Sequence, residues 1–184
     1  MRPRVARSAS AWWNATKTLL QSAAMWGVFF ALLPAAVFTL EARSGLAAWR
    51  FDAGAGGRAA AVVAFVVLGA LGLGTGVQLA VLGDGTPLPL DTARRLVIRG
   101  AYRHVRNPMA MTSLAQGAAI GVWLGSPAVL AYVVAGAALW QFVARPWEER
   151  DLVARFGAEY EAYRGAVRCW VPRVRPYVPP DPDL

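Results

Sequence analysis

Four long stretches of the chain contain no charged residue, and they constrain the fold more than any other feature. They are residues 19–40, 59–82, 109–125 and 128–144, with lengths of 22, 24, 17 and 17 residues. About 20 apolar residues in a helix cross the hydrocarbon core of a bilayer, and about 17 are the lower limit. The chain is therefore expected to be an all-α integral membrane protein with four transmembrane helices. We expect a single domain, residues 1–184, in which the last two helices form a hairpin.

The positions of the basic residues predict how these helices are oriented. Of the 19 Lys and Arg residues, 16 lie before residue 19, in residues 83–108 or after residue 144. Four crossings place these three regions on one side, and such an excess marks the cytoplasmic side. We therefore expect both termini in the cytoplasm and the protein in the cytoplasmic (inner) membrane. The net charge of +8 is then explained by orientation and by contact with membrane lipids, so no nucleic acid partner is expected.

The cysteine and histidine counts exclude two further kinds of site. Cys169 is the only cysteine, so the chain forms no intrachain disulfide. Together with the single histidine, His104, it cannot supply the roughly four ligands that a structural zinc site requires. No metal site is expected.

Two polar segments on the predicted cytoplasmic side, residues 83–108 and 145–176, carry the side chains with chemistry. In the first segment, glycines and prolines prevent a regular helix. Pro108 then opens the third membrane helix at a position where its missing N–H costs nothing. Because helix N-termini attract anionic groups, Arg106 and Asn107 could hold a carboxylate or a phosphate there.

Glu148 and Glu149 stand near the start of the second segment, where we predict a cytoplasmic C-terminal helix. Neighbouring residues of a helix point in different directions, so the two glutamates are poor candidates for a shared acid–base pair. One interpretation pairs Glu149 with Arg145, four residues earlier, and leaves Glu148 to Arg150 or to solvent. In the other interpretation, one glutamate faces a cavity and binds a cationic group of a ligand. These residues alone leave both interpretations open.

Together, the two segments resemble the core of the integral-membrane isoprenylcysteine carboxyl methyltransferase and phospholipid N-methyltransferase superfamily, as it reads in bacterial members. The first contains GTPLPLDTARRLVIRGAYRHVRNPM, where the family has G-T-P-x-P and then L-V-x-x-G-x-Y-R-x-x-R-N-P-M. The second contains EERDLVARFGAEYEAYR and then VPR, where the family has E-E-x-x-L-x-x-x-F-G-x-x-Y-x-x-Y and V-P-R. The resemblance covers about half of the chain, with a helical hairpin between the blocks.

The resemblance implies a membrane enzyme that transfers a methyl group from S-adenosylmethionine to a lipid-soluble small molecule. The acceptor atom would belong to a carboxylate, an amine or a thiol. The positions assigned to cofactor binding are Tyr102, Arg106, Asn107, Pro108, Met109, Glu148 and Glu149. Arg164 and Arg168 are assigned to substrate binding. No catalytic residue is assigned, because in-line methyl transfer depends more on positioning than on acid–base groups.

Departures from the family pattern keep two other functions open. Ala110 and Thr112 stand where the family has a tyrosine and a glycine, and Ala166 stands where a basic residue is common. These changes would also fit a catalytically degenerate membrane scaffold. The second alternative is an NADPH-dependent membrane reductase of the sterol-reductase type, whose C-terminal pattern also contains a Phe-Gly pair like Phe156-Gly157 and a tyrosine like Tyr160.

Overall fold

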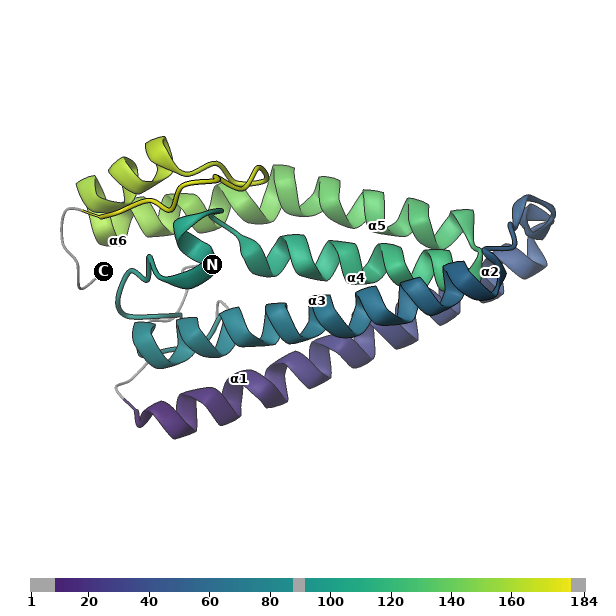
Figure 1. Ribbon diagram of the computed structural model, residues 1–184, viewed down its shortest axis with the longest axis horizontal. Helices are drawn as coiled ribbons and strands as arrows, with labels where there is room; N and C mark the ends of the chain where they lie inside the picture. The colour runs from purple at the N-terminus through teal and green to yellow at the C-terminus, as the bar shows by residue number, and fades with distance from the viewer. Residues whose placement is uncertain (1–8, 88–91, 180–184) are drawn as a thin grey trace.

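The computed structural model describes residues 9–87 and 92–179 and consists almost wholly of helices (Figure 1). In chain order its elements are α1 (Ala11–Trp26), η1 (Gly27–Leu32), α2 (Leu33–Arg43), η2 (Leu46–Trp49), α3 (Gly54–Gly83), η3 (Gly100–Arg103), α4 (Pro108–Leu124), α5 (Pro127–Leu139), η4 (Trp140–Ala144) and α6 (Arg145–Ala166). These residues contain no β-strand, only an isolated bridge between Thr86 and Thr92. The predicted all-α fold is confirmed. Pro89 and the N-terminal Arg2, Arg4 and Arg7 lie outside the described residues.

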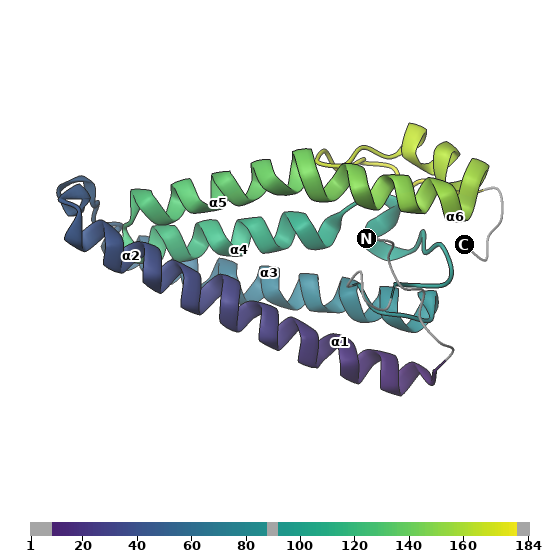
Figure 2. The ribbon, with the colours of Figure 1, turned by 180° about the vertical axis from the view of Figure 1, so that it is seen from behind.

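Three helices are long and apolar enough to cross a membrane: Ala11–Arg43, Gly54–Gly83 and Pro127–Ala166. The chain is therefore an integral membrane protein. Helix α4 has 17 residues and lies beside α3 and α5 (Figures 1 and 2). Helix α1 begins and α6 ends at the same end of the bundle (Figure 1), as an even number of crossings requires. The number four itself stays a prediction.

Local signals set the ends of these helices. Ser10 caps the first helix by accepting a hydrogen bond from the Trp13 N–H at 3.2 Å, so the helix begins before the predicted span at residue 19. The predicted hairpin is confirmed, because Gly125 ends α4 with a left-handed φ of 62° and Ser126 caps α5. Pro34 and Pro146 are each the second residue after a π-helical turn, η1 and η4. A proline has no N–H for the helical ladder, which accounts for a break in the regular pattern at both places.

The helices pack through small residues and turn their large apolar side chains outward. A Cβ atom added at Gly69 would lie 2.8 Å from a ring carbon of Trp26, and one added at Gly72 would lie 2.7 Å from the Thr112 hydroxyl. The outer face of α3, by contrast, exposes valines such as Val63 and Val66. Close contact through glycine inside and apolar side chains outside is the arrangement of helices packed in lipid.

One end of the bundle is closed by a buried ion pair that we call the α2–α5 clamp: Glu41, Arg50 and Ser126. The Glu41 side chain is 1% exposed. Its carboxylate accepts hydrogen bonds from Arg50 Nε at 2.9 Å, from Ser126 Oγ at 2.8 Å and from the Ala128 N–H at 3.2 Å. The clamp therefore joins the end of α2 to the first turn of α5, at the end of the bundle opposite α6 (Figure 2).

Candidate functional site

The two polar segments predicted from the sequence lie side by side at the other end of the bundle. The C-terminal segment, residues 167–179, runs along the stretch that leads into α4. The Arg106 N–H donates to the Arg168 carbonyl at 3.0 Å, and the Arg173 N–H donates to the His104 carbonyl at 2.8 Å. Backbone hydrogen bonds therefore join segments that are about 60 to 70 residues apart in the sequence.

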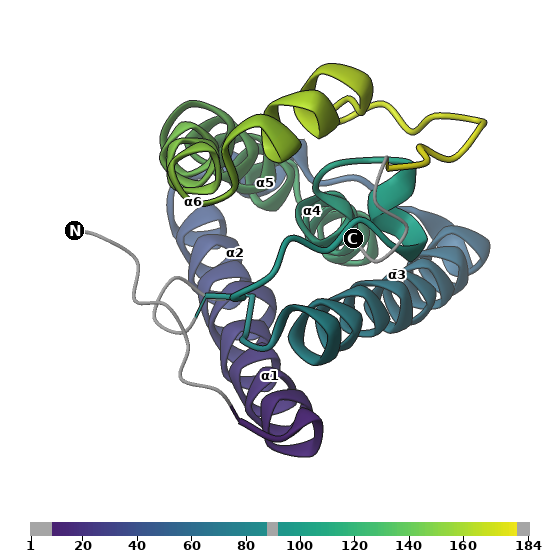
Figure 3. The ribbon, with the colours of Figure 1, turned by 90° about the vertical axis from the view of Figure 1, so that its left-hand side faces the viewer.

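A bend within α6 makes this contact possible. Gly157 has φ 52° and ψ −127°, which no helix residue adopts, and the last part of α6 turns across the end of the bundle (Figure 3). Beneath the bend a small core forms from Leu96, Ile98, Tyr160, Tyr163 and Val167, with Leu152, Val153, Phe156 and Tyr177 around it. The C-terminal helix predicted for this region exists, but it continues directly from α5 and is broken at Gly157.

Tyr102 is held by this core. Its ring is buried, and its backbone carbonyl accepts a hydrogen bond from the Tyr163 hydroxyl at 2.7 Å. Burial raises the pKa of the Tyr102 hydroxyl, as does the nearby Glu148 carboxylate. The hydroxyl is therefore protonated at neutral pH, and Tyr102 can act as a hydrogen-bond donor beside the glutamates.

An arginine–glutamate cluster, formed by Arg106, Arg145, Glu148 and Glu149, lies where the two polar segments meet. Arg106 Nη1 is 2.6 Å from Glu149 Oε1, and Arg145 Nε is 2.9 Å from the same oxygen. The Arg106 and Glu149 side chains are only 10% and 16% exposed. The Arg145–Glu149 pair of the first sequence interpretation is thus present. The contact between Arg106 and Glu149, which are 43 positions apart, was not predicted from the sequence.

Two groups of the cluster have no partner within the part of the chain that the structure describes. Arg106 Nε is buried and forms no hydrogen bond. Glu148 is half-buried and takes part in no hydrogen bond or ion pair. Burial, and to a lesser extent the charge of Glu149, raise the pKa of Glu148 to about 7. Buried polar groups normally have partners, so a free donor and a free carboxylate in one cluster indicate capacity for a ligand.

The next three predicted cofactor residues, Asn107, Pro108 and Met109, form the first turn of α4. Asn107 Oδ1 accepts a hydrogen bond from the Ala110 N–H at 2.9 Å and so caps the helix. Pro108 occupies the first turn, and the Met109 methyl group packs close to Gly76 of α3. In this structure, these residues fix the position of α4 beside Arg106. A direct contact with a cofactor stays a prediction.

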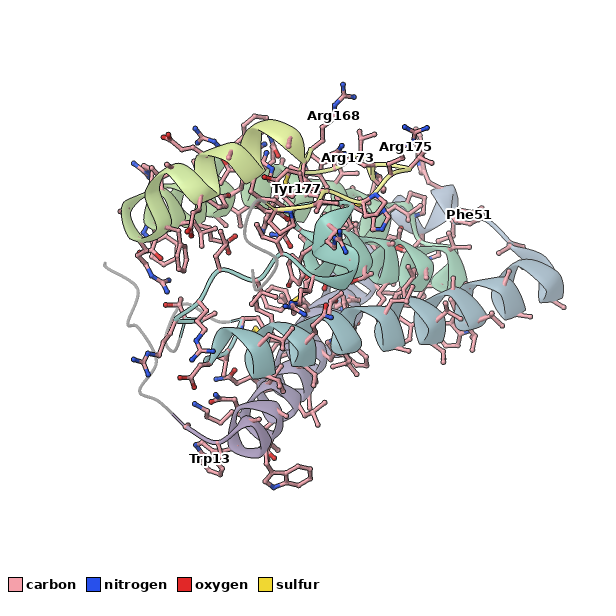
Figure 4. The ribbon with its side chains drawn as sticks, turned by 60° about the vertical axis from the view of Figure 1, so that its left-hand side comes forward. Trp13, Phe51, Arg168, Arg173, Arg175 and Tyr177 are labelled. Atoms are coloured by element: carbon pink, nitrogen blue, oxygen red, sulfur yellow. The ribbon has the colours of Figure 1, made fainter. Side chains whose placement is uncertain are left out.

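Of the two predicted substrate residues, the structure brings only one close to the cluster. Arg164 Nη1 is 4.0 Å from Glu149 Oε2, on a side chain that is 42% exposed. The Arg168 side chain projects away from the bundle (Figure 4), and its backbone carbonyl, not its guanidinium, contacts the Arg106 segment.

Two residues, one in the cluster and one near it, were not assigned to a ligand site by the sequence. Arg145 shares Glu149 with Arg106, and its spacing of four residues from Glu149 is the signal that could have shown it. Cys169 is buried near the cluster, and burial raises the pKa of its thiol although Arg145 and Arg106 oppose the shift. Nothing in the local sequence of Cys169 indicates this position. In the described ranges, no group of three or more His, Cys, Asp or Glu side chains could hold a metal ion.

Comparison with known proteins gives one match. The model of the family described as "Phospholipid methyltransferase" matches residues 58–159, more than half of the chain. The matched region runs from α3 into α6 and contains all four residues of the arginine–glutamate cluster, whereas Glu41 and Arg50 of the α2–α5 clamp lie outside it. No significant match was found among curated proteins or among solved structures.

Proposed function

The chain belongs to the phospholipid methyltransferase family, and we propose on this basis that it methylates a lipid-soluble acceptor with S-adenosylmethionine as the donor. Membership makes it a membrane protein of a methyltransferase family, which acts on lipid-like substrates. We further propose which cofactor the protein uses, which residues hold it and on which side of the membrane the site lies.

The free groups of the arginine–glutamate cluster fit the charged end of this cofactor, and this observation carries the proposal. The methionine part of S-adenosylmethionine has a carboxylate and an ammonium group on one carbon. Arg106 Nε is a buried donor without a partner, which suits the carboxylate. Glu148 is a carboxylate without a partner, which suits the ammonium group. A cluster that contains both a free donor and a free carboxylate matches an amino acid end better than it matches a phosphate or a simple cation.

Glu149 has a different role from Glu148 in this proposal. Arg106 and Arg145 both contact its Oε1, at 2.6 and 2.9 Å, and these two positive charges make Glu149 less attractive to a cationic ligand than Glu148. Glu149 is therefore a positioning residue, which holds the Arg106 guanidinium through Nη1. Tyr102, buried and protonated, adds a further hydrogen-bond donor.

When bound, S-adenosylmethionine would supply a methyl group on a positively charged sulfur. A nucleophile of the acceptor would attack the methyl carbon in line with the carbon–sulfur bond, which breaks and releases a neutral thioether. The protein residues bind, orient and exclude water, and no acid–base residue is required for the step. The acceptor's own carboxylate, amine or thiol provides the electron pair. An apolar acceptor reaches the site from the bilayer, since the cluster lies where α4 and α5 leave their apolar segments.

We place this site on the cytoplasmic face of the inner membrane. The excess of arginine in residues 83–108 and 145–176 supports this orientation, with both termini in the cytoplasm. The described chain agrees with it, because α1 begins and α6 ends at the same end of the bundle as the cluster (Figure 1).

Transfer of a radioactive methyl group tests the function directly. The purified protein is incubated with methyl-labelled S-adenosylmethionine and a membrane lipid extract, and label in the organic phase is measured. We expect incorporation that is lost in the Glu148→Gln variant. Release of volatile methanol by base then identifies a methylated carboxylate, because N-methyl and S-methyl products are stable to base. No incorporation by folded protein, over lipid extracts from several sources, would instead favour a degenerate scaffold.

A further inference from the structure

A cleft of about 400 Å³ opens on another side of the segment that leads into α4. Its walls come from the end of α3, from η3 and from the C-terminal segment, and its lining residues are Gln78, Ile98, Arg99, Gly100, Arg103, Val178 and Pro179. None of them belongs to the arginine–glutamate cluster. In the view along the bundle, α3 and the segment that contains η3 lie away from the start of α6 (Figure 3). The cleft is thus a separate feature of the molecule.

Arg103 presents its guanidinium group to this cleft in a fixed position. Arg103 Nε donates to the Tyr177 carbonyl at 2.7 Å. Its two terminal nitrogens form no hydrogen bond or ion pair with any residue that the structure describes. A guanidinium held by Nε with both terminal nitrogens available can bind two oxygens of one phosphate, which is a geometry that arginine favours.

Gln78 supplies an amide group to the same cleft. Gly100 has a left-handed φ of +55°, and a Cβ atom added there would lie 2.6 Å from Gln78 Oε1. Only glycine lets the Gln78 amide lie against η3. Among the described residues, the lining contains two arginines and one amide, and no carboxylate.

The surroundings of the cleft indicate that its ligand comes from the membrane. The C-terminal segment extends along the bundle to about the level at which α4 begins (Figure 1), with Arg175 projecting at its outer tip (Figure 4). In this segment Val174 is 96% exposed and Val178 is 70% exposed, and no acidic residue occurs between residues 162 and 179. Exposed valines between arginines are typical of a segment at the interface between headgroups and acyl chains.

We propose that this cleft binds the phosphate group of a phospholipid headgroup, held by Arg103 and Gln78. The lipid is bound at the edge of the protein and is distinct from the methyl acceptor, so the proposal does not depend on methyl transfer. A second cleft, of about 310 Å³, lies beside Glu41 and is lined mainly by apolar residues. Its lining includes the Glu41 carboxylate, whose negative charge disfavours a phosphate there.

Ligand-induced stabilisation of the detergent-purified full chain tests the proposal, because a ligand that binds only the folded state raises the Tm. Short-chain phosphatidylglycerol, which has no amine to methylate, is titrated against the protein while Tm is followed by tryptophan fluorescence. Parallel titrations use short-chain diacylglycerol, which lacks the phosphate, and inorganic phosphate. We expect a saturable rise with phosphatidylglycerol and none with diacylglycerol. Inorganic phosphate acting equally well would support the phosphate site and assign it to the free ion.

Two variants locate the binding. Arg103→Lys keeps the positive charge but loses the pair of terminal N–H donors of the guanidinium. Gln78→Glu has nearly the same shape, but its negative charge repels phosphate. Each is expected to weaken phosphatidylglycerol binding about tenfold. Gln78→Glu keeps the test valid if Arg103→Lys fails to fold. Arg95→Gln, an exposed arginine outside the cleft, is the matched control and should bind as the wild type does. Equal affinity in all variants, or stabilisation by diacylglycerol, would overturn the proposal.

Discussion

Each end of the bundle contains a buried pair of glutamate and arginine, and the two pairs differ in what they leave unbonded. In the α2–α5 clamp, the three donors Arg50, Ser126 and the Ala128 N–H use both oxygens of Glu41. Arg50 also donates to the Phe38 carbonyl at 2.8 Å and covers the Phe38 ring at 3.6 Å. The arginine–glutamate cluster instead leaves Arg106 Nε and Glu148 without partners among residues 9–87 and 92–179.

This difference separates structural from ligand-binding ion pairs within one molecule. A buried charge needs full compensation to contribute to stability, and the clamp has it. A cluster that keeps a free donor and a free carboxylate lacks some of that compensation in the absence of a ligand, and a ligand can supply it. The family match agrees with this division, since it includes the cluster and excludes Glu41 and Arg50.

The largest effect should come from breaking the α2–α5 clamp. Glu41→Ala leaves the Arg50 charge and the Ser126 hydroxyl without their acceptor, which should lower the free energy of unfolding by about 3 kcal/mol. Thermal unfolding in detergent measures the loss. S-adenosylmethionine affinity of the remaining folded protein should not change.

The double variant Glu41→Leu with Arg50→Leu is the control for this prediction. It removes both charges and should recover part of the stability, because no uncompensated charge remains. A Glu41→Ala protein that unfolds at the wild-type temperature would show that the clamp is not structural.

Removing Arg106 should mainly affect the ligand. Arg106→Gln should weaken S-adenosylmethionine binding by about tenfold, the loss expected for a hydrogen bond between charged groups. Its effect on Tm should be smaller than that of Glu41→Ala, because Glu149 keeps Arg145 at 2.9 Å. Isothermal titration gives the affinity, with Arg95→Gln as the control. If both substitutions reduce the affinity equally, Arg106 has no special role.

The raised pKa of Glu148 predicts a pH dependence of binding. With a pKa of about 7, the carboxylate that would attract the ammonium group is mostly ionised at pH 8 and mostly protonated at pH 6. Affinity for S-adenosylmethionine should therefore fall about tenfold between pH 8 and pH 6. The Glu148→Gln variant should bind weakly at both values. A wild-type affinity that is constant over this range would contradict the assignment of Glu148.

The same pKa predicts the opposite trend for the stability of the free protein. Because the folded state raises the pKa of Glu148 from 4.5 to about 7, it binds the proton more tightly than the unfolded chain does. The contribution of Glu148 to stability should therefore decrease as the pH rises from about 4.5 to about 7. Comparing the Tm of the wild type with that of Glu148→Gln over this range isolates the effect.

The smallest effect is expected at Arg164. Its guanidinium is 4.0 Å from Glu149 on a side chain that is 42% exposed, and such pairs contribute between about 0 and 1 kcal/mol. Arg164→Gln should change S-adenosylmethionine affinity by less than about threefold, and high salt should remove the difference. A larger loss of S-adenosylmethionine affinity in Arg164→Gln than in Arg106→Gln would contradict the role given to Arg106 in the cluster.

The sequence predicted the parts of the fold that depend on local patterns. The uncharged runs coincide with helices of the structure, and the hairpin was predicted between the last two runs, where Gly125, Ser126 and Pro127 favour a turn. The helix ends were less accurate: α3 starts at Gly54 rather than at residue 59. A helix continues until a cap or a break ends it, and hydropathy does not report such signals.

Contacts between distant residues limited what the sequence could show of the site. Arg145 was paired with Glu149 because four positions bring two side chains together on one helix. The Arg106–Glu149 contact spans 43 positions, and Glu41 and Ser126 are 85 positions apart. No periodicity predicts such pairs. The family resemblance placed Arg106 and Glu148 in one site. Only the structure shows that Glu149, and not Glu148, is paired with two arginines.

Equilibrium binding of S-adenosylmethionine to the detergent-purified protein, with NADPH as the parallel ligand, tests the central claim most directly. We predict saturable binding of S-adenosylmethionine alone, weakened by Glu148→Gln and by Arg106→Gln but not by Arg95→Gln. Binding of NADPH alone, or of neither ligand by protein that is demonstrably folded, would contradict it.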